Sequence, residues 1–136
     1  MGTAMKIKEQ RGGSALEFAI VLSLLVLILF GIIEFGLVLY NQQVITNASR
    51  EGARAGIVAR SPRLSVNEIS AVVNAYCAGN LVTFGSAISP AVNIDNSGGA
   101  SFGDDLEVEV TWQYDFLVLP DFLGRPLVAK TVMKYE

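Results

Sequence analysis

The chain has 136 residues, a formal net charge of −3, no histidine and one cysteine, Cys77. This composition excludes an intramolecular disulfide, the usual Cys/His zinc sites and histidine-based acid–base or nucleophilic chemistry. The charge balance provides no basic field for nucleic acid. We therefore expect no enzyme, cofactor, metal site or nucleic-acid partner, and we expect Cys77 to be a small apolar core residue.

An uninterrupted apolar stretch, FAIVLSLLVLILFGII, occupies residues 18–33 and contains no charge. As a helix it would cover about 24 Å, and its extension to Tyr40 about 35 Å, against a hydrocarbon core of about 30 Å. It is apolar on every side, which favours a transmembrane helix over residues 13–40 rather than a buried core helix or a removable signal. Glu17 and Glu34 bracket the stretch. Because a carboxylate at mid-membrane costs at least about 2.5 kcal/mol, we place each near one face of the bilayer, with Glu34 as the boundary residue.

The segment before this stretch has the form of a processing site. A basic leader ends in Gly12, then Gly13-Ser-Ala-Leu16 follows, and Glu17-Phe18 opens the apolar helix. This resembles the prepilin peptidase site of type IV pilins, in which a cut after a glycine leaves a glutamate as the fifth residue. The resemblance implies a leader over residues 1–12 and a cut between Gly12 and Gly13.

The wider region from Arg11 to Arg60 resembles the TadE-like proteins of tight-adherence (Tad) pilus systems. The segments that carry the resemblance are GGSALEFAIVLSLLVLILFGIIEFG and ITNASREGARAGIV. The family implies a minor pilin or pseudopilin in the bacterial inner membrane, with its N-terminus cytoplasmic and its C-terminal domain outside. The implied partners are a prepilin peptidase, other pilin or pseudopilin subunits, the assembly-platform proteins and the lipid bilayer. The positive-inside rule, by contrast, hardly discriminates between the two orientations, because similar numbers of basic residues lie on the two sides of the stretch.

The resemblance also suggests a role for Glu17. In pilins the fifth-position glutamate is thought to meet the terminal ammonium of a neighbouring subunit during assembly. The other reading is a carboxylate stabilised by the dipole at a helix N-terminus. Both readings remain open from the sequence.

After the membrane, nothing breaks the helical pattern before Ser61-Pro62, so residues 41–60 are predicted to continue the helix as an amphipathic stalk. Ala48, Gly52 and Gly56 recur every four residues. Such a line of small residues lets another helix approach closely. The partner could be this chain's own domain or a neighbouring subunit.

Residues 61–136 are predicted to form a small α+β domain outside the cytoplasm, which completes a pilin-like fold. Ser65 and Glu68 form a capping box that opens a helix ending at Gly79-Asn80. Alternating residues predict strands near 92–95, 106–115 and 127–135, the last two pairing antiparallel. We expect the helix to bury Val66, Ile69, Val72, Val73 and Tyr76, and we expect Lys130 and Lys134 to face Glu107 and Glu109.

Two stretches of the domain allow more than one interpretation. Residues 116–124 are apolar and are expected to pack on the sheet or to form a contact surface. Asp104 and Asp105 lie in a glycine-flanked loop and are expected to form turns rather than a carboxylate-based active site.

Two functions fit these features. The first is a membrane-anchored structural subunit, a minor pilin or pseudopilin that helps to assemble a Tad-type (type IVb) pilus for surface adhesion. The second is a membrane-tethered binding or adhesin module that is not processed as a pilin. The mature N-terminus discriminates between them, because only the first requires a chain that begins at Gly13.

Overall fold

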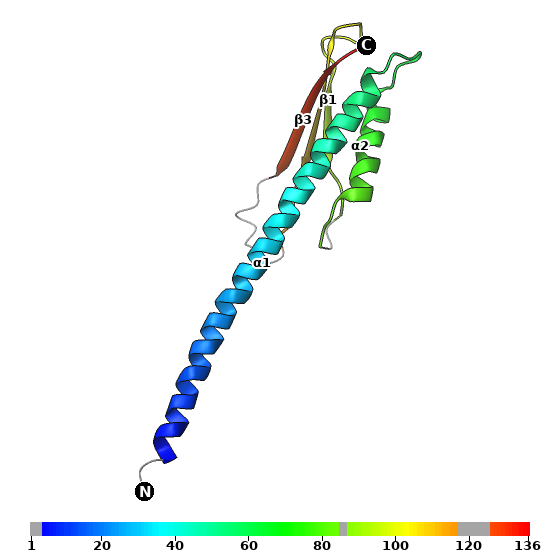
Figure 1. Cartoon of the computed structure of the whole chain (residues 1–136). Coiled ribbons are helices and arrows are strands. Elements are labelled where there is room, and N and C mark those ends of the chain that lie inside the picture. Colours follow the sequence, from blue (N-terminus) through cyan, green and yellow to red (C-terminus); the bar gives the residue numbers. More distant parts are fainter. Residues whose placement is uncertain (1–3, 85–86, 117–125) are drawn as a thin grey trace.

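A computed structural model describes residues 4–84, 87–116 and 126–136, with side chains from residue 12 onward. Its elements follow the order α1 (Ala4–Ile57), α2 (Val66–Asn80), β1 (Ala91–Asp95), β2 (Asp105–Trp112) and β3 (Leu127–Lys134). The N-terminal half of α1 stands alone, and its C-terminal half packs against α2, β2 and β3 (Figure 1). The α+β class, with one long helix, one extra helix and a small antiparallel sheet, is confirmed.

Helix α1 runs for 54 residues, a length of about 80 Å. It ends at Ile57, slightly before the predicted stop at Ser61-Pro62. The carbonyl of Ile57 accepts the Arg63 guanidinium at 3.2 Å and the Glu136 amide at 3.4 Å. These donors satisfy an orphan carbonyl of the last turn and tie the end of the helix to the C-terminus of the chain.

Helix α2 begins at the predicted capping box. The Ser65 amide donates to the Glu68 carboxylate at 2.8 Å, and the Glu68 amide donates to the Ser65 hydroxyl at 3.4 Å. Its buried residues are Ile69, Val73 and Cys77, so the core position of Cys77 is confirmed. Val66, expected on the same face, is exposed. It is the first residue of α2, directly after the cap at Ser65.

The sheet has the order β1-β2-β3, with both pairs antiparallel. The predicted alternation of β2 is confirmed, since Leu106, Val108, Val110 and Trp112 are all buried. Lys130 stands opposite Glu109 and forms an ion pair with Glu107 at 2.7 Å.

The predicted pairing of Lys134 with a glutamate of β2 is wrong. Lys134 stands opposite Asp105, and its ammonium lies 2.8 Å from that carboxylate. Lys130 and Lys134 are four residues apart, so the register that sets Lys130 opposite Glu109 sets Lys134 opposite Asp105.

The core lies between the outer half of α1, α2 and the inner face of the sheet. Val92 and Ile94 of β1 are half-buried against it. The buried residues come from α1, α2, β2, β3 and the segments that directly follow α2, β2 and β3: Val44, Ile45, Ala48, Ala53, Ile69, Val73, Cys77, Leu81, Leu106, Val108, Val110, Trp112, Tyr114, Ala129 and Tyr135. A domain this small depends on the stalk for a large part of its core. Of the stretch 116–124, Phe116 is half-buried against this core, and the rest lies outside the described residues.

Candidate functional site

The N-terminal half of α1 is an apolar rod that the rest of the chain does not cover. Side chains from residue 12 to 30 are exposed, and an 18-residue window has a mean hydropathy of 2.9 with none of it buried. By length and composition this helix is able to cross a membrane. Its hydroxyl, on Ser23, donates to the Ala19 carbonyl at 2.8 Å and so has a partner without leaving the helix. A fully exposed apolar rod of this kind fits a lipid environment.

The residues of the predicted processing site lie near the N-terminal end of this rod, far from the domain (Figure 1). Gly12 and Gly13 are exposed, and a Cβ added at either would meet nothing within 4 Å. Glu17 is exposed one turn further along, about 6 Å in rise from Gly13 and on the same side of the helix. The arrangement leaves both the glycines and the carboxylate accessible to another protein.

The small residues of the stalk face the chain's own domain. Ala48, Gly52 and Gly56 are all buried. A Cβ at Gly56 would lie 2.5 Å from Leu106 Cδ2 of β2, and a Cβ at Gly52 would overlap Val73 Cγ2 of α2. Of the two partners that the sequence left open, the structure therefore shows the domain. At Gly52 and Gly56 it approaches α1 so closely that an added methyl group would force a neighbouring side chain to move.

Two buried polar residues of α1 were missed by sequence reasoning. The side-chain amide of Asn41 donates to the Val82 carbonyl at 2.9 Å and accepts from the Val82 amide at 3.0 Å. The Ser49 hydroxyl lies 2.7 Å from that of Thr131 on β3. Both residues follow Glu34 at helical spacing on one stripe of α1, and that spacing is the signal that could have identified them.

Glu34 lies at the junction between the rod and the domain. Its side chain is 3% exposed, so the domain covers the carboxylate that we had expected to reach water at the membrane boundary. Tyr114 is 2% exposed nearby, and its hydroxyl has no hydrogen-bond partner among the described residues. Burial, and secondarily the charge of Glu34, raise the pKa of Tyr114. Glu34 is therefore the first residue along α1 at which helix and domain share buried surface.

Three aromatic rings form a ladder at this end of the sheet. Trp112 and Tyr114 stand edge to face with centroids 5.9 Å apart, and Tyr114 and Phe116 do so at 5.2 Å. Such contacts stabilise beyond the area that they bury. The ladder extends the inner face of β2 beyond the end of the strand, toward the free half of α1.

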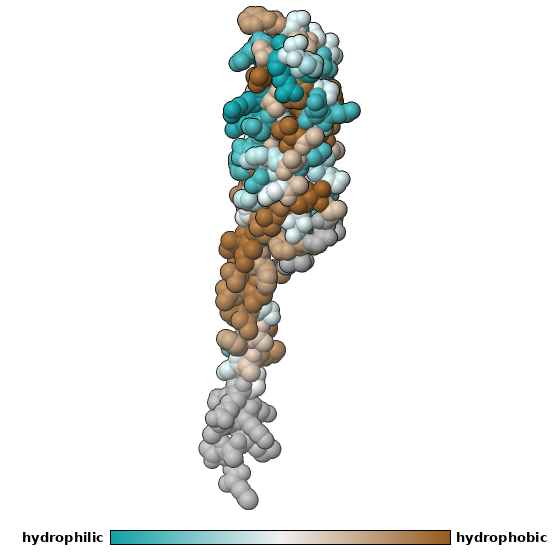
Figure 2. All heavy atoms as spheres, turned by 90° about the vertical axis from the view of Figure 1, so that its right-hand side faces the viewer, coloured by the Kyte–Doolittle hydropathy of each residue, from teal (hydrophilic) through white to brown (hydrophobic). Residues whose placement is uncertain are grey.

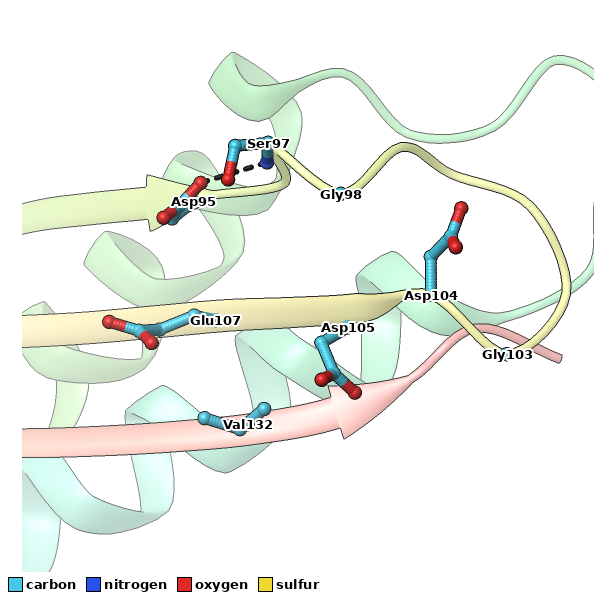
Figure 3. A pocket seen from close by; sticks show the side chains of 8 residues that line it. All are labelled: Asp95, Ser97, Gly98, Gly103, Asp104, Asp105, Glu107 and Val132. Carbon is cyan, nitrogen blue, oxygen red and sulfur yellow. Dashed lines mark hydrogen bonds between the residues drawn. The ribbon is translucent and has the colours of Figure 1, made fainter.

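The far end of the domain carries an open hollow lined by acidic side chains (Figure 3). Asp95 accepts the Ser97 amide at 2.8 Å, which holds the pKa of its carboxyl below the ordinary value. Asp104 accepts the Ser101 amide at 2.9 Å, while Asp105 is paired with Lys134. These carboxylates thus shape turns and pair strands. Within the described parts of the chain, no group of three or more potential ligands is placed to hold a metal ion.

Taken together, these features define a membrane-anchored α+β protein whose long helix serves both as anchor and as part of the domain core. A family model described as TadE-like protein matches residues 12–54. This part of the chain, from the candidate cleavage site through most of the stalk, is similar to TadE-like proteins, which confirms the resemblance seen in the sequence. The match associates the protein with Tad pili. The comparison with curated proteins found no match, and the comparison with solved structures found none either.

Proposed function

We propose that this protein is a minor pilin or pseudopilin that a prepilin peptidase cleaves between Gly12 and Gly13, and that it acts in assembly of a Tad-type pilus for surface adhesion. The observation that carries the proposal is the TadE-like match over residues 12–54, which includes both glycines, the apolar rod and most of the stalk. The role is structural rather than catalytic. The helix lies in the inner membrane with its N-terminus cytoplasmic and its domain outside, where other pilus subunits and the assembly platform are its partners.

The position of Glu17 supports this proposal. Cleavage after Gly12 creates an ammonium at Gly13, one turn before the Glu17 carboxylate. Both groups are on the exposed part of α1, away from the described parts of the domain (Figure 1). A neighbouring subunit that packs its helix alongside could therefore place its own ammonium against Glu17. In a lipid environment such a pair is worth more than on a water-exposed helix.

Cleavage is tested by intact mass and N-terminal sequencing of the chain produced with and without a prepilin peptidase. We expect a mature chain that begins at Gly13 only when the peptidase is present. Gly12→Leu should block cleavage, because it changes the residue before the cut without touching any other part of the chain. Gly36→Leu is the matched control, since that glycine also has open space around it, and it should be cleaved normally. A chain that keeps its first residues in the presence of the active peptidase contradicts the proposal and supports the unprocessed binding module.

The assembly role is tested with Glu17→Gln, which removes the charge and keeps the shape. We expect the variant to reach the membrane and to leave few or no pili on the cell surface, as counted by electron microscopy. Glu51→Gln is the control, because Glu51 is exposed on the stalk beyond the membrane. If Glu17→Gln changes neither processing nor pilus number, Glu17 has no role in assembly.

A further inference from the structure

The end of the domain nearest the apolar rod carries exposed apolar side chains. Those at this level are Leu39 and Tyr40 on α1 and Val82 and Phe84 after α2, here called the membrane-proximal surface. We infer that this surface rests in the headgroup layer of the phospholipid bilayer, so that the domain, and not only the helix, contacts lipid. The inference depends on the membrane anchor within the proposed function and is independent of processing.

The first observation in support is the position along α1 at which the domain begins. Residues 14–33 form twenty helical positions, about 30 Å, which matches the hydrocarbon core. Burial by the domain starts at Glu34, immediately after this segment, and continues through Asn41. The headgroup layer adds roughly 5–7 Å on each side, and the rise from Glu34 to Asn41 is about 10 Å before any tilt of the helix. The lower end of the domain therefore falls within the headgroup layer when the apolar rod fills the core.

The second observation in support is a pair of hydrogen bonds that hold the segment after α2 against α1 at Asn41. The Asn41 side chain binds both the amide and the carbonyl of Val82, at 3.0 and 2.9 Å. From there the described chain runs on toward the free half of α1 (Figure 1). Phe84, which is 49% exposed, is thus held at the lower end of the domain rather than folded back into its core.

The third support is the chemistry of the surface. Tyrosine suits the boundary between acyl chains and headgroups because its ring is apolar and its hydroxyl can reach water, and the apolar phenylalanine and leucine side chains can insert on the acyl side of that boundary. In Figure 2 the hydrophobic surface of the rod continues onto the lower end of the domain, whereas the far end is mainly hydrophilic. Continuity with the membrane-spanning part of the same helix identifies the occupant as lipid.

Spin-label accessibility in vesicles tests this inference. The uncleaved full-length chain, with Cys77→Ala to remove the buried thiol, is reconstituted in phosphatidylcholine–phosphatidylglycerol vesicles. A nitroxide is attached through Phe84→Cys, and through Leu27→Cys and Phe102→Cys as references. Leu27 is exposed on the rod, and Phe102 is 88% exposed at the opposite end of the domain. All three side chains point out of the core, so the labels should leave the fold intact, which is checked by circular dichroism.

The measured quantity is the ratio of accessibility to oxygen, which concentrates in lipid, over accessibility to a water-soluble nickel chelate. We expect the ratio at position 84 to exceed that at position 102 several-fold and to remain below that at position 27. A ratio at 84 equal to that at 102 overturns the inference. Spin–spin broadening at 84 that disappears on dilution with lipid, together with that low ratio, would show that a second copy covers the surface instead. Since the uncleaved chain is used, the result stands apart from the test of processing.

Discussion

Replacing Gly52 by alanine tests whether α1 really belongs to the core of the domain. The added Cβ overlaps Cγ2 of Val73 and lies 3.5 Å from Val108 Cγ1. Val73 is fully buried and sits in a helix, where a valine has one strongly preferred rotamer, so its methyl group has no free space to enter. Overpacking of this kind costs about 1–3 kcal/mol, while the better helix propensity of alanine returns about 1 kcal/mol.

We therefore expect Gly52→Ala to lower the free energy of unfolding by about 1–2 kcal/mol net. For a domain of this size the loss corresponds to a fall in Tm of about 5–15 °C. The assay is thermal unfolding of the full-length chain in detergent micelles, followed by the near-ultraviolet circular dichroism of its single tryptophan, Trp112.

The matched control is Gly79→Ala, in the last turn of α2. A Cβ there meets nothing within 4 Å, so only the propensity gain of up to about 1 kcal/mol applies, and Tm should rise. A Gly52→Ala protein as stable as the Gly79→Ala protein would refute the close approach of α1 to α2 described above.

Four smaller effects can be measured in the same micelles. Ser65→Ala should cost about 1 kcal/mol of stability through loss of the cap. The hydrogen bonds from Ser65 hold the pKa of Glu68 below its ordinary value of 4.5, so the contribution of Glu68 is present above that pH and is lost as the pH falls through the lowered pKa. The Tm difference between the natural chain and Glu68→Gln should accordingly vanish in acid, and a constant difference would be inconsistent with this. The Lys130–Glu107 pair is exposed, and a double-mutant cycle should give a coupling energy of only about 0–1 kcal/mol. Burial raises the pKa of the Cys77 thiol, which should react with thiol reagents only after denaturant unfolds the domain; rapid labelling of the native chain would be the contrary result.

Local patterns in the sequence were sufficient to predict most of the elements. The apolar run over residues 18–33 predicts an exposed helix because no partner could cover every side of it. The Ser65–Glu68 capping box predicts the start of α2, since both halves of the box lie within one turn. Strict alternation predicts the inner face of β2, because successive side chains of a strand point to opposite faces. Partners across the strands were harder to predict. Lys130 and Lys134 are four residues apart whereas Glu107 and Glu109 are two apart, so one register cannot set both lysines opposite a glutamate.

Other features depended on which surfaces meet in three dimensions. The pattern of small residues at Ala48, Gly52 and Gly56 permits a close approach without naming the partner, and only the packed structure shows α2 and β2 there. Glu34 and Asn41 look like polar interruptions of an apolar helix, yet the domain buries both. The sequence by itself determined the anchor, the caps and the alternating faces, because each of these depends on neighbours along the chain. The tertiary structure decided which stripe of α1 the domain covers and how far toward the membrane the domain extends, because those depend on contacts between residues distant in sequence.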